Sequence, residues 1–168
     1  MIQGVQYAIF ATDAGWLGVV GSAEGLQRIT LPQHSAREVR QLLGNSLSRA
    51  SESPHLFQDL MERLRLYFGG HKVVFSDKLD PPGTAFQREV WKATRLIPYG
   101  KTMSYRWVAG KIGKPKAARA VGQALGRNPL PIIVPCHRVL ASDGGLGGFT
   151  GGVETKKYLL QLEAAATI

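Results

Sequence analysis

The sequence predicts an α/β (α+β) protein in two parts. A small β-meander with helices is expected over residues 1–79, followed by a mainly helical domain over 80–168 with a helix-turn-helix. Short strand-like segments separated by turn residues occur near the N-terminus. Helical periodicity dominates the remainder. Between them, the segment Asp80-Pro81-Pro82-Gly83 favours a boundary, because proline removes a backbone donor and restricts its neighbours. The length of 168 residues suits one domain, or two small ones that share a core.

The N-terminal half predicts strands at 5–10, 17–20 and 26–30, joined by short turns at 13–15 and 24–25. Ser35-Ala36-Arg37-Glu38 has the capping-box pattern that begins a helix. The polar segment 45–54 predicts a loop. Apolar residues at helical spacing over 56–68 predict a second helix, which Gly69-Gly70 ends. A further strand is a candidate at 73–75.

The C-terminal half predicts four helices. The first begins at Thr84 and ends before Pro98-Tyr99-Gly100. Ser104 caps a second, from Tyr105 to Ile112, and a third has Pro115 in its first turn and extends to about Arg127. Helix, glycine turn, helix is the pattern of a helix-turn-helix. The last helix is expected from near Glu154 to Glu163.

The third of these helices is narrow, because alanine and glycine occupy many of its positions. One face should pack on the core, and the other carries Lys116, Arg119, Ala120, Gln123 and Arg127. A helix that reads the major groove usually carries several long polar side chains. Small residues with one or two arginines instead favour shape-driven contact in the minor groove, with little sequence readout. The alternative is a tightly packed Ala/Gly helix in an α-helical protein.

The net charge of +9 is concentrated in the second half. Residues 1–79 hold 8 basic and 7 acidic residues, whereas residues 80–168 hold 13 basic and 5 acidic ones. No acidic residue occurs between Glu89 and Asp143, where ten basic residues lie. This distribution favours a polyanionic partner such as nucleic acid. The alternative is a basic surface without such a partner.

The sequence gives no indication of a membrane or secreted protein. No apolar run approaches the ~20 residues of a membrane helix. The N-terminus lacks the basic segment and cleavage site of a secretory signal. The single cysteine, Cys136, excludes an internal disulfide. We therefore expect a cytoplasmic protein, associated with the nucleoid if the source is prokaryotic.

Cys136 is the candidate nucleophile. It follows an apolar run that ends in proline, and it precedes His137 and Arg138, which would lower the thiol pKa if they faced it. Six of the ten residues over 143–152 are glycine, so a ligand can approach the backbone there. A carboxylate of the last helix, Glu154 or Glu163, would complete a Cys–His–Glu relay. The alternative is a buried, inert cysteine.

These residues together form a recognisable set. The chain resembles the O6-alkylguanine-DNA alkyltransferases, also called methylguanine-DNA methyltransferases. The resemblance is detailed over about residues 84–163, whereas the N-terminal half resembles the family only in size and layout. The matching stretches are Phe86-Gln87, Val90-Trp91, Ile97-Pro98-Tyr99-Gly100, Ser104-Tyr105, residues 114–122, Asn128-Pro129, residues 133–139, Gly151-Gly152 and residues 156–163.

The resemblance implies a mechanism. Cys136 would accept the alkyl group from O6 of guanine, irreversibly and once, with His137 linked to it through a water. Glu163 would orient His137, and Tyr105 would act on the base as a hydrogen-bond donor or proton source. Asn128 would brace the turn before the cysteine. A nucleotide flipped out of the duplex is physically required, because a stacked base cannot reach an enclosed thiol.

The resemblance also implies the surrounding sites. Duplex DNA would contact Arg119, which fills the gap left by the flipped nucleotide, together with Ala118, Lys116, Gln123 and Tyr105. The substrate pocket would include Pro131, Val139, Phe149, Thr150, Gly151 and Lys156. Phe149 stands where many members have tyrosine, so a hydroxyl contact is lost. Some members bind zinc through cysteines in the N-terminal half. This chain has none there, and we expect no metal or cofactor. The expected partner is duplex DNA with O6-alkylguanine, bound by a monomer; cooperativity and activity on O4-alkylthymine stay open.

Three other functions are weighed against this one. A catalytically silent lesion binder would lack the cysteine, which Cys136 in its PCHRV motif argues against. A Cys–His peptidase usually takes its histidine from a distant segment and has no need of the acid-free basic stretch. A helix-turn-helix regulator would need a helix better equipped for reading bases.

Overall fold

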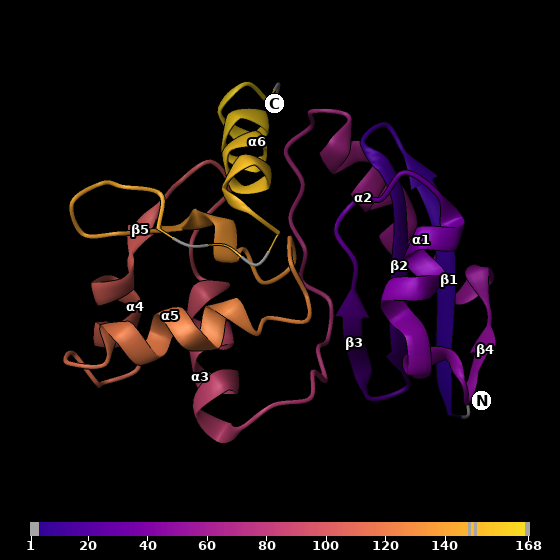
Figure 1. The fold of residues 1–168 in the computed structure, drawn as a ribbon, viewed down its shortest axis with the longest axis horizontal. Coiled ribbons are helices and arrows are strands. Elements are labelled where there is room, and N and C mark those ends of the chain that lie inside the picture. The colour runs from indigo at the N-terminus through magenta and orange to yellow at the C-terminus, as the bar shows by residue number, and fades with distance from the viewer. Residues whose placement is uncertain (1–3, 148, 150, 167–168) are drawn as a thin grey trace. The chain divides into compact units, whose positions relative to one another are not determined.

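The sheet and helices form two separate units in the computed structural model, which describes residues 4–147, 149 and 151–166 (Figure 1). The first unit ends at Pro82 and the second spans Gly83–Ala166, whereas the predicted boundary follows residue 79. The elements of the first unit are β1 (Val5–Thr12), β2 (Gly15–Ser22), β3 (Gly25–Ile29), α1 (Ala36–Leu43), β4 (Ala50–Glu52) and α2 (Gln58–Phe68). Those of the second are α3 (Ala85–Thr94), β5 (Met103–Ser104), α4 (Tyr105–Lys111), α5 (Ala118–Gly126), β6 (Val139–Leu140) and α6 (Val153–Ala164). The predicted α/β class is confirmed.

The sheet of the first unit has the strand order β3-β2-β1-β4. The predicted meander is present, since β1 pairs with β2 and β2 with β3, both antiparallel. The prediction of a loop over 45–54 missed β4, a short and mostly exposed strand that pairs parallel to β1. The candidate strand at 73–75 is wrong: these described residues form no strand. The chain instead bonds to β3 further on, where Leu26 exchanges backbone hydrogen bonds with Lys78 and Asp80.

Helices cover both faces of this sheet. Val39 and Leu43 of α1 pack with Tyr7 and Val20 in one buried cluster. On the other face of β1, Phe10 lies under the guanidinium of Arg65 from α2, 5.4 Å from the ring centroid. Residues alternate between the faces of a strand, so Tyr7 and Phe10 point in opposite directions. Helix α2 begins later than predicted, because residues 54–57 form a 3₁₀ turn that starts at a proline.

In the second unit, α3 begins with a complete capping box. The Thr84 hydroxyl accepts from the Gln87 amide, and the Gln87 side chain accepts from the Thr84 amide. The indole Nε1–H of Trp91 donates to the carbonyl of Ala124 at 2.9 Å, which ties α3 to α5. This hydrogen bond fixes α3 and α5, which precede Cys136 in the sequence, against each other.

The predicted helix-turn-helix corresponds to α4 and α5 (Figure 1). Ser104 caps α4 as expected, accepting from the Trp107 amide at 3.0 Å. Helix α5 begins at Ala118 rather than near Pro115, because the preceding residues form a turn closed by a bond from the Ala117 amide to the Lys114 carbonyl. Val121, Ala124 and Leu125 are its buried residues. No helix in the described part of the chain is long and apolar enough to cross a membrane.

A two-stranded parallel sheet in the second unit was not predicted. Met103 pairs with Val139 and Ser104 with Leu140. These strands have only two residues each, too short for a periodic pattern. The pairing places the start of α4, and thus Tyr105, beside the segment that follows Cys136.

Candidate active site

Cys136 lies buried at the start of a 3₁₀ turn, at the end of a strained loop. Ile132 in this loop has a φ of +76°, which is unfavourable for a β-branched residue. The side chain of Asn128 braces the loop. Its amide nitrogen donates to the Val134 carbonyl at 2.9 Å, and its oxygen accepts from the Leu130 amide at 2.9 Å. The bracing that the resemblance implied for Asn128 thus has a geometric basis.

The Cys136 thiol opens onto a pocket of about 500 Å³. Most of its wall comes from α4 and α5, and the lining residues are Tyr105, Arg119, Gly122, Gln123, Leu125, Gly126, Cys136 and Phe149. Four of the lining residues from α5 are spaced three or four positions apart, namely Arg119, Gly122, Gln123 and Gly126. One face of this helix therefore forms the wall. Cys136, the candidate nucleophile, and the second helix of the predicted helix-turn-helix therefore share one cavity.

The predicted pocket residues are only partly brought together. Among those described, Phe149 lines the cavity, whereas Pro131, Val139 and Lys156 are buried outside its lining and Gly151 is exposed. Thr150 lies outside the described residues. The residues predicted to contact DNA are likewise only partly brought together at the cavity. Arg119, Gln123 and Tyr105 line the cavity, Lys116 is exposed before α5, and Ala118 is half-buried at its first turn.

His137 is bound to Glu163, not to Glu154. The distance from His137 Nε2 to Glu163 Oε2 is 2.5 Å, and both side chains are buried. Glu154 is exposed in the first turn of α6. The structure thus resolves which carboxylate meets the histidine. Because Nε2 is engaged by Glu163, a relay from the thiol would have to pass through Nδ1 of His137.

The charge state of this pair follows from its surroundings. Burial alone would raise the pKa of Glu163, but the hydrogen bonds from His137 and Arg138 lower it to about 2. Burial lowers the pKa of His137 by more than the bond and charge of Glu163 raise it. Glu163 is therefore ionised and His137 neutral at pH 7. The ring carries its proton on Nε2, which donates to Glu163, and Nδ1 is left with the basic lone pair.

The pKa of the Cys136 thiol is raised in the structure. Burial raises the pKa of Cys136, while a hydrogen bond from Asn128, the charge of Lys156 and nearby backbone amides lower it less. Of the two neighbours that would lower this pKa if they faced the thiol, His137 contributes through its backbone amide while its imidazole is neutral, and the guanidinium of Arg138 is bound to Glu163. The thiol rests protonated and needs a base to become a nucleophile.

Lys156 is the charged side chain that lowers the pKa of the Cys136 thiol. Its fully buried ammonium donates to the carbonyl of Val139 at 2.7 Å and also to that of Leu146. It thereby ties the glycine-rich loop to the segment that follows the cysteine. The ammonium also lies 5.8 Å from the ring centroid of Tyr105. Burial lowers the pKa of Lys156, and the thiolate form of Cys136 opposes this.

Tyr105 is held as a neutral hydrogen-bond donor. Burial, and to a lesser extent the charge of Cys136, raise the pKa of its hydroxyl. Gly147 packs directly against it, because a Cβ at this position would lie 2.7 Å from the Tyr105 oxygen. Gly147 also has a φ of +69°, so a side chain there is disfavoured twice.

Comparison with known proteins agrees with this geometry. Residues 85–165 match a family described as 6-O-methylguanine DNA methyltransferase, DNA binding domain. A protein of Methanosarcina acetivorans, named methylated-DNA–protein-cysteine methyltransferase, is 41% identical over 160 residues, 95% of this chain and 98% of the relative. The chain belongs to the O6-methylguanine-DNA methyltransferase family. The resemblance stated from the sequence is thereby confirmed. A methyltransferase of the same name from Haemophilus influenzae is 39% identical over 158 residues, 94% of this chain and 85% of that protein.

Solved structures extend the similarity to the whole fold of the methyltransferase. The O6-methylguanine methyltransferase of Mycobacterium tuberculosis superposes with a TM-score of 0.83 at 39% identity, over 98% of this chain and 96% of that one. The M. tuberculosis protein has also been solved in complex with DNA. That structure has a TM-score of 0.80 and 40% identity, over 95% and 92% of the two chains.

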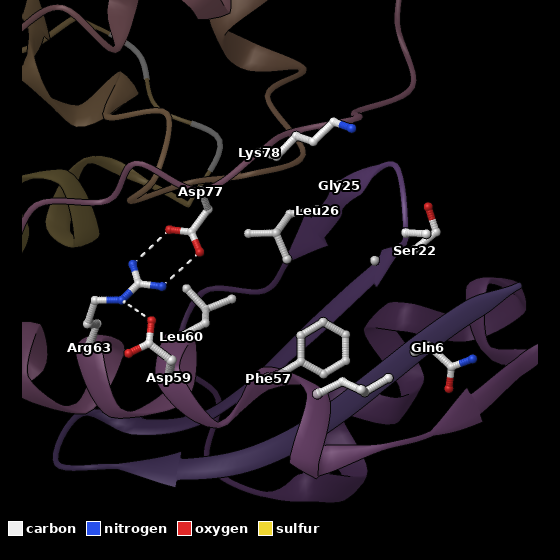
Figure 2. A pocket seen from close by; sticks show the side chains of 13 residues that line it. Gln6, Ser22, Gly25, Leu26, Phe57, Asp59, Leu60, Arg63, Asp77 and Lys78 are labelled. Carbon is white, nitrogen blue, oxygen red and sulfur yellow. Dashed lines mark hydrogen bonds and ion pairs between the residues drawn. The ribbon is translucent and has the colours of Figure 1, made fainter. Parts of the chain in front are cut away.

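A second cavity of this methyltransferase, of about 310 Å³, lies within the first unit (Figure 2). Arg63 closes one end through a two-pronged ion pair with Asp77, at 2.7 and 2.8 Å, and a bond to Asp59. Its middle is apolar, with Leu26 and Leu60. Within the described residues, no cluster of three or more His, Cys, Asp or Glu is placed to hold a metal ion.

Proposed function

We propose that the protein repairs DNA by transferring the alkyl group from O6 of an alkylated guanine to the Sγ atom of Cys136. The observation that carries this proposal is the cavity shared by the thiol and α5, with His137, the residue after the thiol, neutral and bound to Glu163. A DNA-binding helix and a nucleophile in one pocket suit chemistry on a base.

The transfer is a substitution at the alkyl carbon. The thiol proton of Cys136 passes to Nδ1 of His137, through a water if one bridges them, and Sγ attacks the carbon. A C–S bond forms while the C–O bond breaks, and its electron pair stays on guanine. Tyr105 donates a hydrogen bond to the departing guanine anion. His137 then releases the thiol proton through solvent to that anion, so guanine leaves neutral and His137 returns to its neutral form. No electron is gained or lost overall.

The substrate reaches the thiol only if the nucleotide leaves the duplex. A stacked base presents O6 in the major groove and cannot enter an enclosed cavity. Arg119, exposed on the pocket face of α5, is the side chain placed to fill the resulting gap. The short side chains of α5 suit the minor groove, and the basic residues between Glu89 and Asp143 supply phosphate contacts with little sequence preference.

We propose a single turnover for each molecule. A thioether is chemically stable, and the sequence has no second cysteine to accept the group. We also propose a monomer on DNA. The cytoplasmic location expected from the sequence stays a prediction, and O4-alkylthymine, which carries the same alkyl–oxygen group, is a further substrate to test.

The proposal is tested by incubating the protein with duplex DNA that carries labelled O6-methylguanine, then mapping the label by peptide digestion. The expected result is label on the peptide that contains Cys136. Retention of the methyl group on DNA, with tight binding, would instead indicate a silent lesion binder. The same assay with O4-methylthymine decides the substrate range.

A further inference from the structure

Arg138 follows His137 in the sequence, but its guanidinium binds a buried carboxylate. Nε donates to Oε1 of Glu163 at 2.8 Å and an Nη donates to Oε2 at 3.0 Å, a two-pronged pair. The other Nη donates to the carbonyl of Ile97 at 2.9 Å. Arg138 is 7% exposed. Its position is therefore defined by three hydrogen bonds from a rigid group.

The same carboxylate collects donors on both of its oxygens. Oε1 also accepts from the backbone amide of Gly100 at 3.0 Å, and Oε2 is the atom bound to His137. Four donors occupy about all the lone-pair directions of a carboxylate. Both ends of the segment 97–100 bind this pair: the carbonyl of Ile97 accepts from Arg138, and the amide of Gly100 donates to Glu163. The segment Ile97-Pro98-Tyr99-Gly100, which matches the family's sequence, therefore helps to hold the Glu163–Arg138 pair.

We propose that Arg138 is a positioning residue for alkyl transfer: it holds the Glu163 carboxylate so that this group orients the imidazole of His137 without charging it. The proposal rests on the proposed function. A carboxylate bound only to His137 would direct its whole charge at the ring, and an imidazolium cannot take the thiol proton. With Arg138 in place, much of that charge is balanced from the other side.

Burial is the main cause of the lowered pKa of His137, and among the described residues three charged groups also act on it. Glu163 favours the charged ring, whereas Arg138 and, from α6, Lys156 disfavour it. Tyr99 lies against the guanidinium, which is 5.5 Å from its ring centroid. After removal of Arg138, Lys156 is the cation among the described residues that still disfavours the charged ring. The pKa of His137 should then rise, since Glu163 acts on it with less compensation.

The test compares Arg138→Met and Arg138→Lys with the parent protein. The single-turnover rate of methyl transfer from an O6-methylguanine duplex is measured from pH 5 to pH 9. In Arg138→Met we expect the acid limb to move to higher pH and the rate at pH 7 to fall by about 10- to 100-fold, which reaches only the lower end of the ~10²- to 10⁴-fold that general acid–base catalysis supplies, because the base is impaired and not removed. Lysine keeps the charge but cannot form the two-pronged pair. Its acid limb should stay near that of the parent while its rate falls less.

Val90→Ala is the matched control, because Val90 is fully buried in the same unit and is not one of the hydrogen-bonded residues His137, Arg138 and Glu163. It should lower the melting temperature and leave the pH profile unchanged. An Arg138→Met protein that is slower with an unmoved acid limb would overturn the proposal and leave Arg138 a purely structural role. If Arg138→Met does not fold, Arg138→Lys decides, since a rate equal to that of the parent at every pH would contradict the positioning role.

A second readout separates this proposal from the proposed function. The rate at which iodoacetamide alkylates Cys136 is followed over the same pH range without DNA. If the parent transfers no methyl group, the proposed function fails, yet the iodoacetamide profile still tests Arg138. The same shift of the acid limb in Arg138→Met supports the positioning role, and its absence contradicts it.

Discussion

The substitution Glu163→Gln should destabilise the second unit by about 3 kcal/mol at pH 7. The buried carboxylate has its pKa lowered from an ordinary 4.5 to about 2 by the bonds from His137 and Arg138, against the opposing effect of burial. At 1.36 kcal/mol for each pH unit, this corresponds to about 3 kcal/mol of folding free energy. Removal of one partner of a buried ion pair costs a similar ~3–5 kcal/mol.

The pH dependence distinguishes this charge effect from a simple loss of packing. A lowered pKa in the folded state means that the stabilisation is fully present above pH 4.5 and is lost as the pH falls through 2. The difference in the free energy of unfolding between the parent and Glu163→Gln should therefore shrink to roughly 1.5 kcal/mol at pH 3. His137, whose pKa burial lowers from 6.5, weakens both proteins as the pH falls below that value.

The assay is urea unfolding followed by tryptophan fluorescence in a Trp16→Phe background. This leaves Trp91 and Trp107, both in the second unit, as the probes. Free energies are compared at pH 7, 5, 4 and 3. A difference that stays constant from pH 7 to pH 3, or that is below about 1 kcal/mol at pH 7, would refute the assignment of the charge to Glu163.

Three further predictions concern the reaction and the loop that carries the nucleophile. Cys136→Ala should abolish methyl transfer while its affinity for lesion DNA, measured by fluorescence anisotropy, stays within about threefold, because phosphate contacts supply most of the affinity; residual transfer would contradict this. Arg119→Ala should slow transfer from duplex DNA by about tenfold or more, since unstacking costs a few kcal/mol, and hardly affect transfer from the free modified base; equal losses would argue against gap filling. Asn128→Ala should lower the free energy of unfolding by about 1–3 kcal/mol, through its bonds to Leu130 and Val134; an unchanged urea midpoint would count against the brace.

Local signals were sufficient to predict most of the secondary structure. Alternating apolar residues and glycine turns define the three meander strands, and side-chain caps at Ser35, Thr84 and Ser104 mark helix starts. These are effects of neighbouring residues, so they can be recognised in one sequence. The C-terminal helix was also located correctly, within a residue at its start.

The elements that were missed depend on distant partners. β4 and the β5–β6 pair are too short to carry a pattern, and they exist because another strand lies beside them. The candidate strand at 73–75 has a strand-like sequence, but Val74 is 73% exposed and this stretch has no ladder among the described residues. Pro115 suits a first helical turn, yet the chain uses it in the turn before α5.

The site residues could be named from the sequence, but not their electrostatics. Cys136 and His137 were singled out from the local sequence, and the family resemblance chose Glu163 where spacing alone left Glu154 open. The sequence left open whether Arg138 faces the thiol, because adjacency to His137 does not fix the direction of its guanidinium, which binds Glu163. The buried carbonyl partners of Lys156 on Val139 and Leu146 come from two separate segments, and no local pattern indicates them.

The stoichiometry of transfer tests most directly whether Cys136 accepts one alkyl group and is then spent. Purified protein of known active concentration is mixed with a tenfold excess of O6-methylguanine duplex, and repaired DNA is followed until it stops accumulating. Single-turnover transfer to Cys136 predicts a plateau at one methyl group for each active molecule, with one added methyl, by mass spectrometry, on the peptide that contains Cys136. Continued repair beyond one equivalent without an added acceptor, or a methyl group on any other residue, would contradict it.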